Sequence, residues 1–176
     1  MIFTETRLAG TYAVELEKHE DERGYFARIF GADEFERAGL NPAIAQCSTS
    51  FNRLAGTVRG MHFQAHPHEE CKLVRCTRGA IFDFALDLRK GSPTYLEWVG
   101  FELPAENGRM LYIPEGLAHG FQALADETEV AYQISQPYIP SHARGVRWND
   151  PAFGIEWPLA VTTISERDQN YPDFSP

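Results

Sequence analysis

The sequence predicts a mainly β protein, an antiparallel sandwich or barrel with a few short helices. Short runs of alternating apolar and polar residues recur along the chain, and turn-forming residues separate them roughly every ten residues. Residues 80–88 show the alternation most clearly, because the phenylalanine and leucine side chains fall on one face while Asp83 and Asp87 fall on the other. This spacing favours a sandwich or barrel over a fold of alternating strands and helices.

Turn signals bound each expected element. Residues 11–16 and 25–30 are expected strands on either side of the turn sequence HEDERG, and a helix over 32–39 ends at a glycine before an Asn-Pro pair. The later expected strands are 44–52, 57–64, 72–77, 80–88, 95–103, 110–113, 121–124 and 129–135. The C-terminal segment is rich in Pro, Trp and Asp and is expected to be coil with one or two short helical turns. Without a linker or repeat, residues 1–176 are expected to form a single domain.

The charge balance narrows the class of partner. The chain has 16 Lys and Arg against 25 Asp and Glu, which gives a formal net charge of −9. Binding to the phosphate backbone of nucleic acid needs a basic surplus, so we expect no nucleic-acid partner. A small phosphorylated ligand is still compatible with this charge, because a few arginines that converge in one pocket suffice to bind it.

The sequence also predicts a cytoplasmic protein with no membrane partner. The N-terminus lacks the basic segment and apolar run of a signal peptide, and no apolar run approaches the ~20 residues that a membrane helix needs. Cys47, Cys71 and Cys76 are an odd number of cysteines without the spacing of a disulfide framework. We therefore expect reduced thiols.

Two spaced groups of Gly, His and Pro resemble the signature motifs of the cupin superfamily, a jelly-roll barrel of antiparallel strands. The first contains His66, His68 and Lys72, and the second contains His119 and ends at Ala123. Metal-binding cupins use two histidines, a glutamate and a later histidine as ligands, and Lys72 stands at the glutamate position. Because its ammonium group would repel a divalent cation, we expect no metal and interpret His66 and His68 as residues of a solvated loop.

A second group of residues suits carbonyl chemistry. Within RGMHFQ, strand alternation predicts that Arg59 and Met61 share one face and that His62 and Gln64 share the other. Lys72 lies among apolar strand residues, so it either extends to solvent or faces a wet interior. An interior lysine can stabilise an enolate oxygen while a histidine, with an ordinary pKa of about 6.5, removes the neighbouring proton. A structural, hydrogen-bonded histidine is the alternative.

Tyr132 and Asp168 each have two interpretations. Tyr132 alternates with Val130 and Ile134 in a late strand, so it either packs in the core or returns a proton on the face opposite the base. Asp168, in the sequence SERD, lies either in a solvated helical turn or beside a histidine whose tautomer it fixes.

Several motifs in fixed order resemble the dTDP-4-dehydrorhamnose 3,5-epimerase family. They are RGMHFQ (59–64), KLVR (72–75), DLRKGSPTY (87–95), IPEGLAHGF (113–121), WNDP (148–151) and SERD (165–168), together with Tyr132 and Tyr138. The resemblance runs from about residue 21 to residue 168. It implies a cupin-type epimerase that needs no metal and no organic cofactor.

The resemblance also implies a reaction and a catalytic set. The substrate would be a nucleotide-diphosphate-linked 4-keto-6-deoxyhexose of the dTDP-4-dehydro-6-deoxyglucose type, inverted at C3 and C5 by proton abstraction next to the C4 ketone. His62 would be the base, supported by Asp168. Tyr132 would be the acid on the opposite face, and Lys72 would lie at the C4 oxygen.

Further positions resemble the family's substrate-binding residues. They are Arg23, Arg28, Gln46, Ser48, Arg59, Gln64, His119, Tyr138 and Arg167. Arg23 would contact the diphosphate and Tyr138 would stack on the thymine. The resemblance also implies a homodimer, in which residues from 1 to about 45 are exchanged or packed at the interface.

Four positions depart from the family pattern. Arg28 and Ala143 stand where glutamates are usual, Ser48 stands where asparagine is usual, and Glu70 stands where glutamine is usual. Arginine for glutamate reverses a charge and exchanges an acceptor for donors. We therefore hypothesise that the nucleotide base or the sugar differs from the standard substrate.

Three alternative functions follow from these observations. The chain can be an epimerase that acts at C3 only or on a CDP- or GDP-linked sugar. It can be a metal-dependent cupin that uses His66, His68 and His119. From a different class, it can be an inactive module that binds a sugar nucleotide.

Overall fold

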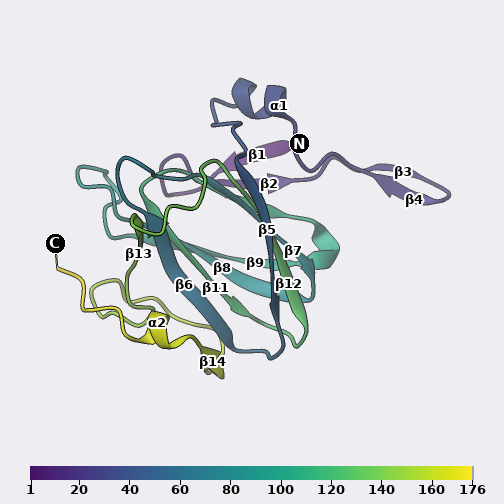
Figure 1. Cartoon of the computed structure of the whole chain (residues 1–176). Helices are drawn as coiled ribbons and strands as arrows, with labels where there is room; N and C mark the ends of the chain where they lie inside the picture. The colour runs from purple at the N-terminus through teal and green to yellow at the C-terminus, as the bar shows by residue number, and fades with distance from the viewer. Residues whose placement is uncertain (176) are drawn as a thin grey trace.

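Two antiparallel sheets face each other and enclose the interior of a barrel (Figure 1). The computed structural model describes residues 1–175. One sheet has the strand order β1-β2-β10-β7-β12-β5, and the other has the order β13-β6-β11-β8-β9, with β14 parallel to β6. The predicted mainly β, antiparallel fold class is therefore confirmed.

The strands of each sheet come from distant parts of the sequence. The first sheet consists of β1 (Ile2–Glu5), β2 (Tyr12–Glu15), β10 (Met110–Ile113), β7 (Lys72–Arg78), β12 (Thr128–Ile134) and β5 (Gln46–Asn52). The second consists of β13 (Ala143–Gly145), β6 (Thr57–Gln64), β11 (Leu117–Ala123), β8 (Ala80–Asp87) and β9 (Trp98–Pro104), with β14 (Thr163–Ile164) beside β6. The helical elements are α1 (Ala32–Arg37), the 3-10 turn η1 (Ala105–Asn107) and α2 (Glu166–Gln169). Among residues 1–175, no helix has the length and apolar character needed to cross a membrane.

A separate hairpin, β3 (His19–Asp21) and β4 (Gly24–Phe26), projects away from the barrel (Figure 1). It replaces the turn and the longer strand that the sequence predicts for this region. Its aromatic side chains are largely uncovered, since Tyr25 is 54% exposed and Phe26 is 72% exposed. Exposed aromatic side chains of this kind along a projecting arm are typical of a surface that another chain covers.

The barrel interior is apolar at one end and polar at the other, along the same strands. In β7, Val74 and Cys76 belong to the apolar cluster between the sheets, while Lys72 faces a pocket. In β12, Val130 belongs to the same cluster, while Tyr132 lies at its margin and lines the pocket. Strand alternation places the named residues of each strand on the interior face, because they are two positions apart.

The alternation predicted for residues 80–88 is present, but the aromatic face points outward. Phe84 and Leu86 pack in a second cluster under the C-terminal coil, against Val146 and Phe153. Asp83 lies on the interior face and is fully buried. Alternation alone shows which residues share a face of the strand. It does not show which face lies inside the barrel, because the C-terminal coil covers the outer face and allows apolar residues there too.

Asp87 anchors the loop that follows β8. Its carboxylate, fully buried, accepts hydrogen bonds from the Arg89 guanidinium at 2.7 and 2.9 Å, the Ser92 hydroxyl at 2.6 Å and the Thr94 hydroxyl at 2.7 Å. This loop occupies residues that the sequence assigns to the start of a strand, so β9 begins at Trp98. Burial alone would raise the pKa of Asp87, but the hydrogen bonds from Arg89 and its neighbours outweigh burial and hold that pKa far below the ordinary value.

Replacing Asp87 with asparagine is expected to lower the free energy of unfolding at pH 7 by about 2–4 kcal/mol, because the Arg89 charge loses its buried partner. Since the folded pKa is depressed, the stability from Asp87 is fully present above the unfolded pKa of about 3.9 and is lost as pH falls through the folded pKa. The difference from the unmodified protein should therefore shrink below about pH 4. Urea unfolding at fixed protein concentration, at pH 7 and pH 3, measures both effects.

The exposed ion pair between Asp33 and Arg37 provides a matched control. Asp33→Asn removes an aspartate charge of the same kind from the surface and is expected to change stability by less than about 0.5 kcal/mol. Equal losses in the two variants would contradict the role assigned to Asp87.

Candidate active site

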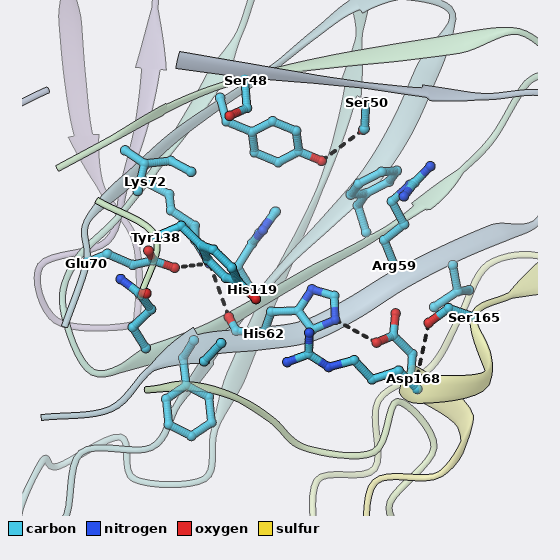
Figure 2. A pocket seen from close by; sticks show the side chains of 18 of the residues that line it. Ser48, Ser50, Arg59, His62, Glu70, Lys72, His119, Tyr138, Ser165 and Asp168 are labelled. Atoms are coloured by element: carbon cyan, nitrogen blue, oxygen red, sulfur yellow. Dashed lines mark hydrogen bonds and ion pairs between the residues drawn. The ribbon is translucent and has the colours of Figure 1, made fainter. Parts of the chain in front are cut away.

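A pocket of about 800 Å³ opens between the two sheets, at the polar end of the barrel interior. Ser48 and Ser50 of β5 and Lys72 of β7 line one wall, while Arg59 and His62 of β6 lie on the facing wall (Figure 2). Its volume lies within the range of pockets that hold small molecules and cofactors. Two sheets thus supply groups that can act on opposite sides of one ligand.

Most of the predicted site residues line this one pocket. They are Gln46, Ser48, Arg59, His62, Gln64, Lys72, His119, Tyr132, Tyr138, Arg167 and Asp168. The pocket contains residues from β5, β6, β7, β11, β12 and α2, so segments far apart in sequence converge on it. The roles of these residues are still predictions.

His62 and Asp168 form a hydrogen-bonded pair, with 2.7 Å between His62 Nε2 and Asp168 Oδ1. The second carboxylate oxygen accepts the backbone N–H of Gly60 at 3.2 Å. Asp168 is buried, whereas the His62 side chain is 39% exposed toward the pocket. The His62 ring therefore has one nitrogen fixed by a carboxylate, the arrangement that suits a general base.

The short helix α2 places this carboxylate. Ser165 precedes the helix, and its hydroxyl accepts the Asp168 backbone N–H at 3.1 Å, which is an N-cap interaction. Burial alone would raise the pKa of Asp168, but hydrogen bonds from His62 and Gly60 outweigh burial and hold that pKa below its ordinary value. Asp168 therefore stays ionised at neutral pH, and SERD is not the solvated helical turn that the sequence left as an alternative.

Strand alternation wrongly separates Arg59 from His62. Both side chains line the pocket, while Met61 packs on the outer face of the sheet. The register between β6 and β11 shifts at this point, so that His62 pairs with His119 and Arg59 pairs with Phe121.

The shift depends on contact between two glycines. Gly60 has φ +136°, and a Cβ at Gly60 would lie 2.5 Å from the Cα of Gly120. A side chain cannot occupy that space, so the strands approach closely only with glycine at these positions.

Lys72 connects the two walls of the pocket. Its ammonium group donates to the backbone carbonyl of His62 at 3.2 Å and pairs with the Glu70 carboxylate at 2.9 Å (Figure 2). The Lys72 side chain is only 9% exposed, so it does not extend to solvent. A paired ammonium inside a pocket is suited to stabilise a negative oxygen that develops on a ligand.

The Tyr132 hydroxyl lies 3.0 Å from the Ser50 hydroxyl. Tyr132 belongs to β12 and His62 to β6, so the two side chains enter the pocket from facing sheets. Burial raises the pKa of the Tyr132 phenol well above its ordinary value, and the hydrogen bond to Ser50 only partly opposes that effect. The phenol is therefore protonated at neutral pH and has a proton to donate.

A second histidine–aspartate pair lies deeper in the barrel. His119 Nε2 is 2.7 Å from Asp83 Oδ1, and both residues are buried. Burial raises the pKa of Asp83, although the nearby His119 ring opposes the shift. Its Oδ2 has no hydrogen-bond partner within residues 1–175. In the sequence, the signal for this pair is Asp83, an aspartate at an alternating position of a strand that is otherwise largely apolar.

The rim of the pocket is fixed by side chains that bind backbone. Gln64 donates to the His68 and Pro137 carbonyls and accepts the Ile139 N–H, so it holds the loop that carries Tyr138. Arg167 donates to the Tyr171 hydroxyl at 2.8 Å beside that loop. An exposed tyrosine and an arginine at the mouth suit the base and phosphates of a nucleotide.

Several predicted residues lie outside this pocket. Arg23 pairs with Asp21 on the projecting hairpin, and Arg28 pairs with Glu34. His66 is 86% exposed on its side chain and pairs with Glu69. Its neighbour His68 packs against His142 rather than entering the pocket. Among residues 1–175 no group of three or more His, Cys, Asp or Glu side chains has a metal-binding arrangement.

The model of the dTDP-4-dehydrorhamnose 3,5-epimerase family matches residues 5–176. The chain belongs to this family. A curated relative of that name from Sinorhizobium fredii is 44% identical over 175 residues, which covers 99% of this chain and 90% of the relative. A dTDP-4-dehydrorhamnose 3-epimerase from Streptomyces niveus is 39% identical, over 93% of this chain and 79% of the relative.

A solved structure of a family member shows the same fold. The dTDP-4-dehydrorhamnose 3,5-epimerase from Bacillus anthracis, with TDP and pyrophosphate bound, superposes with a TM-score of 0.94 at 36% identity. The match covers 98% of this chain and 99% of that structure. The epimerase family thus accounts for almost the whole described chain, and the predicted family resemblance is confirmed.

Proposed function

We propose that the chain inverts C3 and C5 of dTDP-4-dehydro-6-deoxyglucose, a reaction of the isomerase class to which its family belongs. The observation that carries the proposal is that His62 and Tyr132 enter one pocket from facing sheets, with Lys72 between the sheets. A sugar ring held between them would have a base on one face and an acid on the other. Inversion at carbon needs this arrangement.

The reaction proceeds in two proton transfers at each carbon. His62 takes the proton next to the C4 ketone, the electron pair of the C–H bond forms a C=C bond, and the carbonyl oxygen becomes an enolate. Lys72 stabilises the negative oxygen. Tyr132 then donates its proton to the opposite face of the carbon, and exchange with solvent restores both side chains. No oxidation occurs, and substrate and product are isomers.

Nucleotide binding would use the mouth of the pocket. Tyr138, 55% exposed, offers a ring on which a base can stack, and Arg59 and Arg167 offer charge to the diphosphate. Among the departures from the family pattern, Ala143 lines the pocket, whereas Arg28 lies outside it in this chain. Isothermal titration with dTDP, CDP, GDP and UDP tests the base. A clear preference for dTDP is the result expected from the proposed function, and it would contradict the hypothesis of another nucleotide that these departures suggest.

Incubation with dTDP-4-dehydro-6-deoxyglucose in D₂O distinguishes the candidate reactions. Deuterium at C3 and C5 is the expected result. Deuterium at C3 alone would assign the C3-only reaction named for the Streptomyces niveus relative. No deuterium at either carbon would point to another substrate or to an inactive binding module. Stoichiometric Fe, Mn or Zn in elemental analysis would favour the metal-dependent alternative.

We further propose a homodimer in which the β3–β4 hairpin reaches the pocket of the partner. Arg23 lies in the turn at the end of this projecting arm and is 85% exposed on its side chain. This placement explains how Arg23 can bind substrate without lining the pocket of its own chain. We also propose that each chain forms one domain and that the protein is cytoplasmic. The free thiols of Cys47, Cys71 and Cys76 support a location in a reducing compartment.

Mixed dimers test the shared site. Arg23→Ala and His62→Ala are each expected to reduce activity, and their co-expression should restore about a quarter of it, because half of the dimers then contain one intact site. The recovered activity should coincide with the dimer peak in light scattering. If co-expression restores nothing while dimers form, Arg23 acts on its own chain or not at all.

A further inference from the structure

The ammonium group of Lys72 has two partners in the protein. It forms an ion pair with the Glu70 carboxylate at 2.9 Å, and one N–H donates to the His62 carbonyl at 3.2 Å. Among residues 1–175, its N–H groups have no other hydrogen-bond acceptor. Because Lys72 lines the pocket, an N–H that does not face these two partners is available to a ligand there.

Glu70 lines the same pocket. Its side chain is 9% exposed, as is that of Lys72, and it precedes β7 in the sequence. A long lysine side chain has many rotamers, and a single carbonyl acceptor restricts them poorly. A carboxylate attracts the ammonium group with a full charge whereas a carbonyl offers only a dipole, so the ion pair with Glu70 is the stronger of the two restraints.

We propose that Glu70 is a positioning residue that holds Lys72 with a free N–H directed at the C4 oxygen of the substrate. The inference rests on the proposed function, in which Lys72 stabilises the enolate. The chain of contacts continues to the backbone of His62, on the facing sheet. Glu70 thereby fixes the position of the oxygen-binding group relative to the base.

Steady-state kinetics of matched variants test this role. Glu70→Ala is expected to lower kcat about 10- to 100-fold and to leave KM within about threefold, because a misplaced ammonium loses contact mainly in the transition state. Glu70→Gln keeps an acceptor of the same shape and should retain kcat within about tenfold. Glu69→Gln alters the neighbouring carboxylate, which pairs with the exposed His66 instead, and should leave kcat unchanged.

A double variant shows whether Glu70 acts through Lys72. In a Lys72→Ala background, adding Glu70→Ala should cause no further loss of kcat, since there is no ammonium left to position. Losses that multiply would overturn the proposal, as would a Glu70→Ala enzyme with unchanged kcat. Thermal unfolding of each variant identifies losses that come from instability alone.

A measurement without substrate keeps the inference separate from the proposed function. In crystal structures of the ligand-free protein, Glu70→Ala is expected to release Lys72 Nζ from the His62 carbonyl, while Glu69→Gln should not. An ammonium that stays in place after Glu70→Ala would overturn the positioning role. If the unmodified protein fails to epimerise the substrate, the proposed function fails, and this comparison still decides what holds Lys72.

Discussion

Replacing His62 with alanine is expected to lower deuterium incorporation at both C3 and C5 of dTDP-4-dehydro-6-deoxyglucose by about a thousandfold. His62 is the histidine of the pocket that is both partly exposed to it and paired with an ionised carboxylate. His119 is buried and holds Asp83 instead. Loss of proton signals at the two carbons, followed by NMR in D₂O, measures each rate separately.

Two further variants show whether a loss of exchange in His62→Ala is specific to the His62–Asp168 pair. His66→Ala removes an exposed histidine outside the pocket and should leave exchange unchanged. Asp168→Asn should lower exchange by about a hundredfold, because a neutral amide does not stabilise the imidazolium that forms. Exchange at either carbon that persists within tenfold of the unmodified rate in His62→Ala would identify a second base.

Replacing Tyr132 with phenylalanine is expected to separate exchange from inversion. The ring still packs beside the apolar cluster, but the proton donor on the β12 side of the pocket is lost. His62 can still remove a proton and return one to the same face, so deuterium should continue to enter at C3. Formation of the inverted product should fall about a hundredfold. The ratio of product formation to deuterium incorporation, measured in one sample, reports the effect.

Control variants distinguish lost chemistry from lost packing. Tyr112→Phe removes another buried phenol from the same sheet, on the outer face, and should leave the ratio unchanged. Ser50→Ala removes the hydrogen-bond partner of Tyr132 and should lower product formation by less than about tenfold. If inversion and exchange fall together in Tyr132→Phe, the tyrosine is not the acid.

Local pattern predicts most of the strands but not the order in which they pair. The alternation in residues 57–64 and 72–77 locates β6 and β7, yet it does not reveal that Lys72 donates to the His62 backbone from the other sheet. That contact depends on closure of the barrel, which brings together residues from distant strands. The wrong separation of Arg59 from His62 has a similar origin, since a register shift is a property of two paired strands and the alternation within one strand does not reveal it.

The sequence predicts some residues of the site and not others. The motif around His62 identifies a candidate base, and SERD identifies a candidate partner, because family motifs retain both. Alternation assigns Asp83 to one face of its strand but does not indicate that this face is interior, and the four residues of β1 carry too little periodicity to predict a strand. The sequence shows Glu70 as a departure from the family pattern, but its pairing with Lys72 depends on the fold.

The barrel interior has an apolar end that stabilises the fold and a polar end that forms the pocket, so different residues serve folding and ligand binding. Within β7 and β12, residues only two positions apart serve either the apolar cluster or the pocket. We therefore expect a substitution at the pocket end to leave the packing of the apolar end intact. The exceptions are the charged side chains that are paired with each other at the pocket end. The same scaffold can accordingly change its ligand by changing one end of a few strands, so that Ser48 and Ala143 can stand at the rim of a pocket that still contains His62 and Tyr132.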